Sequence, residues 1–216
     1  MTNLPDLATH LREATAEAHA SAEGGTFVRR FMKGELDRAT YQSYLVAMRD
    51  LYAALEAGLA ANRDHAALKA LSFPELPRKD AIASDLAFFE TPADLPAPPA
   101  AVEYAKHLEA IAAENPVLLV AHSYVRYLGD LSGGQALAKA VQRTFGLSGD
   151  DGIAFYRFAE IENLADFKNV YRAALDHLPL SDAEHQAVVE EAKTAFALNG
   201  RVFADLSPDL AAGVES

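Results

Sequence analysis

The sequence predicts an all-α fold, and three observations lead to that prediction. Apolar residues recur at intervals of three and four along most of the chain, whereas alternation of apolar and polar residues is never sustained. Alanine, leucine and glutamate are abundant, and β-branched residues are sparse. Prolines and glycines gather in short stretches that separate the periodic segments. With 216 residues, of which 50% are hydrophobic, we expect one helical domain over residues 1–216.

The N-terminal part is expected to hold three helices. An apolar stripe over residues 4–22 ends at Gly24–Gly25, which predicts one amphipathic helix. A short helix is expected over Phe27–Lys33, just before another glycine. Asp37 is placed to cap a longer helix, whose apolar residues repeat at three and four over residues 41–59.

Prolines divide the middle of the chain. Residues 72–78 contain two prolines and are expected to connect two elements, after which residues 80–89 are predicted to form a helix. Residues 91–99 contain four prolines and predict a stiff linker inside the domain, because apolar-striped segments lie on both sides. Helices are then expected over about 100–114 and 116–145.

Two further helices complete the expected fold. One, with interruptions, is predicted over residues 154–175. Ser181 and Glu184 form a capping box that opens the last helix, which is expected to reach about Leu206. Residues 207–216 are expected to fray.

Composition excludes several function classes. A formal net charge of -12 argues against nucleic-acid backbones and anionic membrane surfaces as general partners. No apolar run approaches the roughly 20 residues that span a bilayer, so no membrane anchor is expected. The first residues do not resemble a secretory signal, and the predicted location is the cytoplasm. Cysteine is absent, which excludes disulfides and thiolates, so a site for a soft metal has to use histidine.

The most informative segment is Leu128–Gly134, which places three glycines and Asp130 inside the expected helix over 116–145. Each glycine in a helix interior costs roughly 1 kcal/mol relative to alanine, so some function must need them. Gly129 and Gly133 are four residues apart and share a helix face, which leaves bare main chain for a flat ligand. Asp130, beside this face, is placed to hold water or handle a proton. The alternative is a structural kink, with Asp130 capping the second half.

His19 is the strongest candidate metal ligand among the seven histidines. Small residues surround it near the end of the first expected helix, so a planar cofactor can reach its ring. Glu23, four residues later, shares that helix face and is placed to orient the imidazole. A surface histidine near a helix C-terminus is the alternative interpretation. His122 lies in an apolar segment and is more typical of a core or pocket edge than of a ligand. The others lie in polar settings and receive no role: His10, His65, His107, His177 and His185.

Three cations are candidates for holding an acidic ligand. Arg12 stands two turns before His19 on the same expected helix, and Lys168 and Arg172 are four residues apart on another. Such groups are placed to clamp two carboxylates, although an ordinary charged surface is the alternative. No glutamate is followed three residues later by a histidine, which argues against a di-iron carboxylate bundle. Phosphate-binding loops and a nucleophile elbow are also missing from the sequence.

The sequence resembles the heme oxygenase family over about Asp6–Leu206. The most specific block is Leu118–Gln135, which reads LLVAHSYVRYLGDLSGGQ. Supporting matches occur at Glu13–Glu23, Asp85–Phe89, Phe167–Arg172 and Glu190–Asn199. The resemblance implies a compact helical fold that sandwiches heme between a proximal helix and a kinked distal helix. His19 would be the proximal iron ligand, and the segment from Gly129 through Gly133 to Gly134 would lie in the distal helix.

The resemblance also implies a reaction. Heme would be both cofactor and substrate, and would be cleaved at a meso carbon, with O2 and reducing electrons, to biliverdin, carbon monoxide and ferrous iron. A ferredoxin or a flavoprotein reductase would supply the electrons. The positions that neighbour the heme propionates in the family correspond to Tyr124, Arg12, Lys168 and Arg172. Ala16 occupies a position that is often basic, which implies a thinner propionate clamp in this chain.

Asp130 is expected to anchor ordered water that delivers protons. The resemblance extends this polar network to Tyr52, Tyr104, Arg126 and Asn199. A non-catalytic heme carrier or sensor on the same fold is the alternative function, and it would need His19 and the propionate clamp but not Asp130. The related helical thiamin-degrading group relies on a cysteine nucleophile, which this chain lacks.

Overall fold

The computed structural model describes residues 4–207, apart from the side chain of Glu23. Within this part of the chain every regular element is helical and no strand occurs, which confirms the predicted all-α class. The α-helices are α1 (Leu7–Ala14), α2 (Ala16–Gly24), α3 (Thr26–Lys33), α4 (Arg38–Ala61), α5 (Ala66–Ala70), α6 (Lys79–Phe88), α7 (Pro99–Glu114), α8 (Leu119–Ser123), α9 (Gly129–Phe145), α10 (Leu164–Asp176) and α11 (Asp182–Asp205). Short 3-10 helices η1 (Pro116–Leu118) and η3 (Ala154–Tyr156) and the π-helix η2 (Tyr124–Leu128) complete the set.

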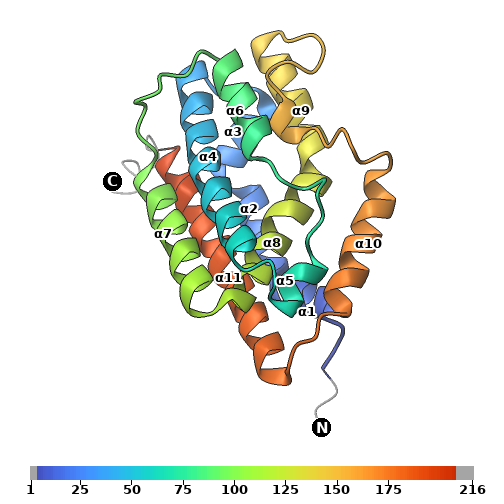
Figure 1. The fold of residues 1–216 in the computed structure, drawn as a ribbon. Helices are drawn as coiled ribbons and strands as arrows, with labels where there is room; N and C mark the ends of the chain where they lie inside the picture. The colour runs from blue at the N-terminus through green and yellow to red at the C-terminus, as the bar shows by residue number, and fades with distance from the viewer. Residues whose placement is uncertain (1–3, 208–216) are drawn as a thin grey trace.

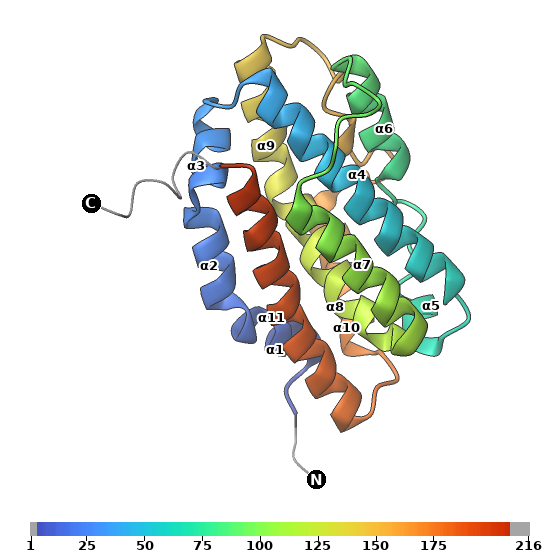
Figure 2. The same ribbon diagram turned by 90° about the vertical axis from the view of Figure 1, so that its left-hand side faces the viewer.

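The long helices pack side by side. α4 lies along α7, α7 along α11, and α11 along α2 (Figure 2). The run from α8 through η2 into α9 packs against α11, α4 and α3 and passes through the middle of the molecule. α10 lies at one edge of the bundle, where it contacts α1 (Figure 1). The apolar faces of these helices meet in one core cluster. No helix in residues 4–207 is long and apolar enough to cross a membrane.

Several expected helix ends are confirmed. α3 stops at Gly34, whose φ of 78° is a left-handed conformation that favours glycine. α4 begins after Asp37, whose carboxylate accepts a 2.7 Å hydrogen bond from the Thr40 backbone N–H. α11 begins with the predicted capping box of Ser181 and Glu184. The predicted frayed tail lies outside the described residues from position 208 onward.

The prediction of one continuous first helix is wrong, because this segment forms two helices, α1 and α2, that meet at Thr15. The backbone leaves helical geometry there, with φ -105° and ψ 2°. The buried Thr15 hydroxyl donates a 2.7 Å hydrogen bond to the carbonyl of Leu11. This bond from a threonine side chain to the carbonyl four residues earlier favours a bend, and the apolar stripe alone could not reveal it.

The helix expected over 154–175 is mostly absent before Leu164. The buried carboxylate of Asp85, on α6, accepts 2.8 Å hydrogen bonds from the backbone N–H groups of Ala154 and Phe155. These bonds hold the short η3 turn, and the chain then becomes extended at Arg157. A contact between distant segments therefore replaces the expected helix.

The helix expected over 116–145 is helical almost throughout, but its geometry changes along its length. The 3-10 helix η1 leads into α8, and the π-helix η2 joins α8 to α9. A π-helical turn widens the backbone locally and shifts the direction of the side chains that follow. The kink expected in this segment is thus a π-helix at Tyr124–Leu128, immediately before Gly129.

Candidate active site

A buried polar network surrounds Asp130 at the start of α9. The Tyr52 hydroxyl, on α4, donates a hydrogen bond to the Asp130 carboxylate. The guanidinium of Arg126, on η2, lies 3.7 Å from the same carboxylate and donates through Nε to the Tyr52 oxygen at 3.3 Å. Arg126 Nη1 donates to Oδ1 of Asn199, on α11, at 2.8 Å. The network therefore joins α4, η2, α9 and α11.

The network is almost closed to solvent. Tyr52 is fully buried, and the side chains of Arg126 and Asp130 are 9% and 10% exposed. Arg126 and Asp130 are four residues apart across the junction of η2 and α9, so the continuous helix brings them to one face. A buried ion pair is tolerated when hydrogen bonds satisfy both groups, and Tyr52 and Asn199 provide those bonds.

This environment changes the acidity of the groups. Burial raises the pKa of Asp130 above its ordinary value, although the Arg126 charge and the hydrogen bond from Tyr52 oppose the shift. Burial likewise raises the pKa of Tyr52 well above its ordinary value. Burial acts to lower the pKa of Arg126, but Tyr52 and Asp130 raise it overall, so Arg126 stays protonated. A carboxyl group with a raised pKa can both accept and release a proton closer to neutral pH.

Tyr104, on α7, extends the network away from Asp130. Its hydroxyl lies 2.8 Å from Nδ1 of the fully buried His122. Burial raises the pKa of Tyr104, while the Arg126 charge and a hydrogen bond with Asn199 oppose this rise. The five residues that the resemblance grouped together thus do lie in one connected region, and His122 is a core histidine as expected.

The glycines beside Asp130 differ in their surroundings. Gly129 and Gly133 are exposed, and a Cβ atom built on either would meet no atom within 4 Å beyond its own neighbours. Gly134 is buried, and its Cβ would lie 3.7 Å from the Cβ of Tyr156. The bare face predicted from the spacing therefore exists at Gly129 and Gly133, whereas Gly134 packs inward.

His19 lies on α2, which packs against α11. It is exposed, and its ring meets the ring of Phe196 on α11 edge-on, with centroids 5.9 Å apart. Phe196 and Asn199 are three residues apart and so neighbour each other on α11. The same turn of α11 therefore contacts His19 and the Arg126 network. The expected contact between His19 and Glu23 falls on a side chain outside the described part of the structure.

The candidate cations come from two helices. Arg12 lies on α1, so the expectation that it shares one helix with His19 is wrong, because the chain bends at Thr15. Burial raises the pKa of Tyr124, and a hydrogen bond with Thr15 and the charges of Arg172 and then Arg12 oppose that rise. The positive charges of both arginines therefore act on Tyr124, at the start of η2. Lys168 is one turn from Arg172 on α10 and is half-buried.

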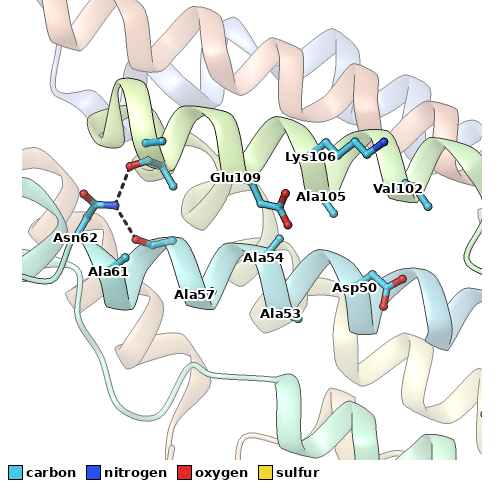
Figure 3. A pocket seen from close by; sticks show the side chains of 13 residues that line it. Asp50, Ala53, Ala54, Ala57, Ala61, Asn62, Val102, Ala105, Lys106 and Glu109 are labelled. Carbon is cyan, nitrogen blue, oxygen red and sulfur yellow. Dashed lines mark hydrogen bonds between the residues drawn. The ribbon is translucent and has the colours of Figure 1, made fainter.

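A separate groove runs between α4 and α7 (Figure 3). It has a volume of about 720 Å³ and is lined mainly by alanines, with Asp50, Lys106 and Glu109 among its polar residues. At one end Asn62 Nδ2 donates 3.0 Å hydrogen bonds to the carbonyls of Gly58 and Ala112. None of the predicted site residues lines this groove, so it is distinct from the candidate site.

A sequence model of the heme oxygenase family matches residues 5–205. The chain belongs to the heme oxygenase family. It is 42% identical to the heme oxygenase of Porphyra purpurea, over 94% of this chain and 88% of the relative. Heme oxygenase 1 of Synechocystis is 40% identical over 95% of this chain and 86% of the relative. Catalytic heme degradation is the function of this family, which confirms the resemblance drawn from the Leu118–Gln135 block.

Solved structures show the same fold. The heme oxygenase of Leptospira interrogans superposes with a TM-score of 0.89 at 44% identity, over 93% of this chain and 99% of that structure. Heme oxygenase-1 of Synechocystis in complex with heme gives a TM-score of 0.90 at 40% identity, over 96% of this chain and 95% of that structure. The arrangement of helices in Figure 1 is thus that of heme oxygenases.

The residues of this heme oxygenase fit heme. His19 presents an exposed imidazole, the kind of group that holds heme iron in proteins. Gly129 and Gly133 leave open space where a side chain would otherwise obstruct a flat ring. Arg12 and Arg172 supply positive charge close to Tyr124, which suits two carboxylates at the edge of a porphyrin.

Sequence reasoning missed one cluster in the structure. His107, His122 and Glu191 come from α7, α8 and α11, and their side chains meet. His107 received no role from the sequence, and Glu191 was not singled out. No spacing rule could have found them, because they come from three different helices.

Proposed function

We propose that this chain cleaves heme oxidatively with O2 and electrons from an external reductase, releasing biliverdin, carbon monoxide and ferrous iron. The observation that carries the proposal is the pairing of an open glycine face with the buried Asp130 network on one helix. A heme carrier would need a ligand and a cationic clamp, but not a carboxyl group of raised pKa beside the open face. The proposed electron donor is a ferredoxin or a flavoprotein reductase, and the cytoplasm is the proposed location.

The proposed roles follow from the chemistry of each side chain. Bound heme supplies the iron at which O2 is reduced and the ring carbon that is oxidised. His19 would hold the iron through its imidazole from α2. Arg12, Lys168 and Arg172, together with the Tyr124 hydroxyl, orient the propionates.

The main chain at Gly129 and Gly133 would leave room for the bound ring, with Gly134 packed inward against Tyr156. Asp130 holds water at its carboxylate oxygens and passes a proton to it. Tyr52 and Arg126 fix the orientation of that carboxylate from the buried side, through the hydrogen bond and the ion pair described above.

Aerobic turnover tests the proposed activity. Mixing the protein with hemin and an electron donor in air is expected to bleach the Soret absorbance and to yield a bilin detectable by mass spectrometry. An Asp130→Asn variant is expected to bind heme with unchanged affinity but to lose most bilin formation. Asp151→Asn makes the same chemical change at an exposed loop residue and is expected to behave as the unmodified protein. Heme that stays intact under these conditions would instead favour a carrier.

A second experiment tests the ligand. His19→Ala is expected to shift the absorption spectrum of the ferric heme complex, and added imidazole is expected to restore it. His177→Ala, at another exposed histidine, serves as the control. An unchanged heme spectrum in His19→Ala would remove His19 from the proposal.

A further inference from the structure

Two histidines and a glutamate from three helices meet at one carboxylate oxygen. Nε2 of His107, on α7, lies 2.6 Å from Oε1 of Glu191, on α11. Nε2 of His122, on α8, lies 2.8 Å from the same oxygen. One potential ligand atom from each of the three residues lies within 4.8 Å of the others. No role in heme cleavage has been assigned to His107 or Glu191.

The three side chains of the cluster differ in solvent exposure, from the core to the surface. The side chain of His122 is fully buried, that of Glu191 is 11% exposed, and that of His107 is 31% exposed. An ion from solvent can therefore approach past His107 without opening the core. The other two ligands are held by the packing of α7, α8 and α11 against one another.

We propose that His107, His122 and Glu191 form a binding site for a divalent first-row transition cation such as Zn²⁺ or Co²⁺. Two imidazole nitrogens and one carboxylate oxygen make a donor set that these ions favour, whereas Mg²⁺ and Ca²⁺ favour oxygen alone. Three protein ligands leave further coordination positions for water, and the exposed edge of His107 gives water access.

Binding an ion requires the two N–O separations to widen and the two imidazole nitrogens, which lie within 4.8 Å of each other, to settle at the same spacing. Metal bonds of about 2.0 to 2.1 Å in tetrahedral geometry place neighbouring ligand atoms about 3.3 Å apart. The observed 2.6 and 2.8 Å are hydrogen-bond separations, so an ion replaces the two hydrogen bonds, each imidazole carries its proton on Nδ1, and the two N–O separations widen by about 0.5 to 0.7 Å. His107 is the most exposed of the three ligands, so the adjustment is least restricted at its ring.

The surroundings also favour ligation. Burial lowers the pKa of His122, despite the opposing Glu191, so its ring is neutral and has a lone pair to offer. Burial acts to raise the pKa of Glu191, but hydrogen bonds from His122 and His107 lower it overall, which keeps it ionised. Nδ1 of His122 lies 2.8 Å from the Tyr104 hydroxyl oxygen, which can accept a hydrogen bond from Nδ1–H in the tautomer that leaves the Nε2 lone pair for a metal.

Cobalt titration of the heme-free, full-length protein tests the site. Co²⁺ is expected to bind with one equivalent per chain and to give visible ligand-field absorption of a site with fewer than six ligands. Zn²⁺ is expected to displace it. His107→Ala, a change at a partly exposed side chain, is expected to weaken Co²⁺ binding at least tenfold, and Glu191→Gln is expected to abolish the visible bands. Circular dichroism of both variants reports whether the helices remain.

Two control variants separate this site from other histidines. His185→Ala removes one member of a second histidine pair, in which His10 Nδ1 and His185 Nε2 lie 3.0 Å apart. His19→Ala removes the proposed iron ligand. Both are expected to leave the Co²⁺ bands unchanged. The proposal is overturned if the unmodified protein gives no such bands, or if they survive in His107→Ala but disappear in either control.

Discussion

Replacing Gly129 or Gly133 by alanine is expected to stabilise the fold and to impair the site at the same time. A Cβ at either position meets no atom within 4 Å, so the fold itself has room for the methyl group. Gly129 has ordinary helical dihedral angles, φ -61° and ψ -50°. Alanine in place of glycine inside a helix contributes roughly 0.5 to 1 kcal/mol, so the double variant gains about 1 to 2 kcal/mol.

The gain in stability is measurable by thermal unfolding of the heme-free protein. For a chain of this length each kcal/mol raises Tm by about 2 to 4 °C. Heme affinity and bilin formation are expected to fall, because a methyl group would occupy the space proposed for the ring. We expect at least a tenfold loss of heme affinity or of bilin yield, which corresponds to about 1.4 kcal/mol.

Two other glycines supply matched controls. Gly200 lies on α11, is exposed, and its Cβ would also meet nothing within 4 Å. Gly200→Ala is therefore expected to give the same stabilisation with no effect on heme. Gly58→Ala is expected to destabilise, since its Cβ would lie 3.0 Å from the Cβ of Ala112. If Gly129→Ala and Gly133→Ala bind and degrade heme as Gly200→Ala does, the reasoning about a bare face is refuted.

Two further predictions concern buried charge. Arg126→Met leaves the Asp130 carboxylate without its cation and is expected to lower the free energy of unfolding, measured in urea, by about 3 to 5 kcal/mol. Adding Asp130→Asn to this variant should recover part of that loss. Strictly additive effects of the two substitutions would contradict the coupling. Burial raises the pKa of Asp85 to about 6 against opposing hydrogen bonds from the Phe155 and Ala154 backbones. The folded state therefore binds a proton that the unfolded state releases near pH 4, so stability should fall by up to about 3 kcal/mol as pH rises from about 4 to about 6. Asp85→Asn should flatten this part of the pH profile of stability, and an equally steep decline in that variant would rule out Asp85 as the cause.

The parts of the fold that depend on local chemistry were predictable from the sequence. The cap at Asp37 and the capping box at Ser181 act within one helical turn, and both are present in the structure. The errors arose where a side chain competes with the helix. At Thr15 the competing hydrogen bond joins the side chain to the carbonyl of Leu11, four residues earlier. At residues 154–155 it comes from Asp85, far away in the sequence, so periodicity could not reveal it.

The candidate site divides in the same way. The glycine face and Asp130 could be proposed from spacing alone, because their residues share one helix. Tyr52, Arg126 and Asn199 could be named only through the family resemblance, since packing of separate helices brings them together. The residues around His107 were found neither way, because the meeting of three helices decides that cluster.

The structure also bears on the two interpretations of the glycine segment. The departure from α-helical geometry lies at Tyr124–Leu128, immediately before Gly129, so the helix is kinked but the kink does not fall on the glycines. Asp130 does not cap α9 either, because no side-chain cap bond is present at that end. What remains are helical glycines beside a buried Arg126–Asp130 pair. The glycines lower stability relative to alanine, and the buried ion pair lowers it relative to an apolar pair. Their concentration on one stretch of helix fits the proposed catalytic surface better than a purely structural helix.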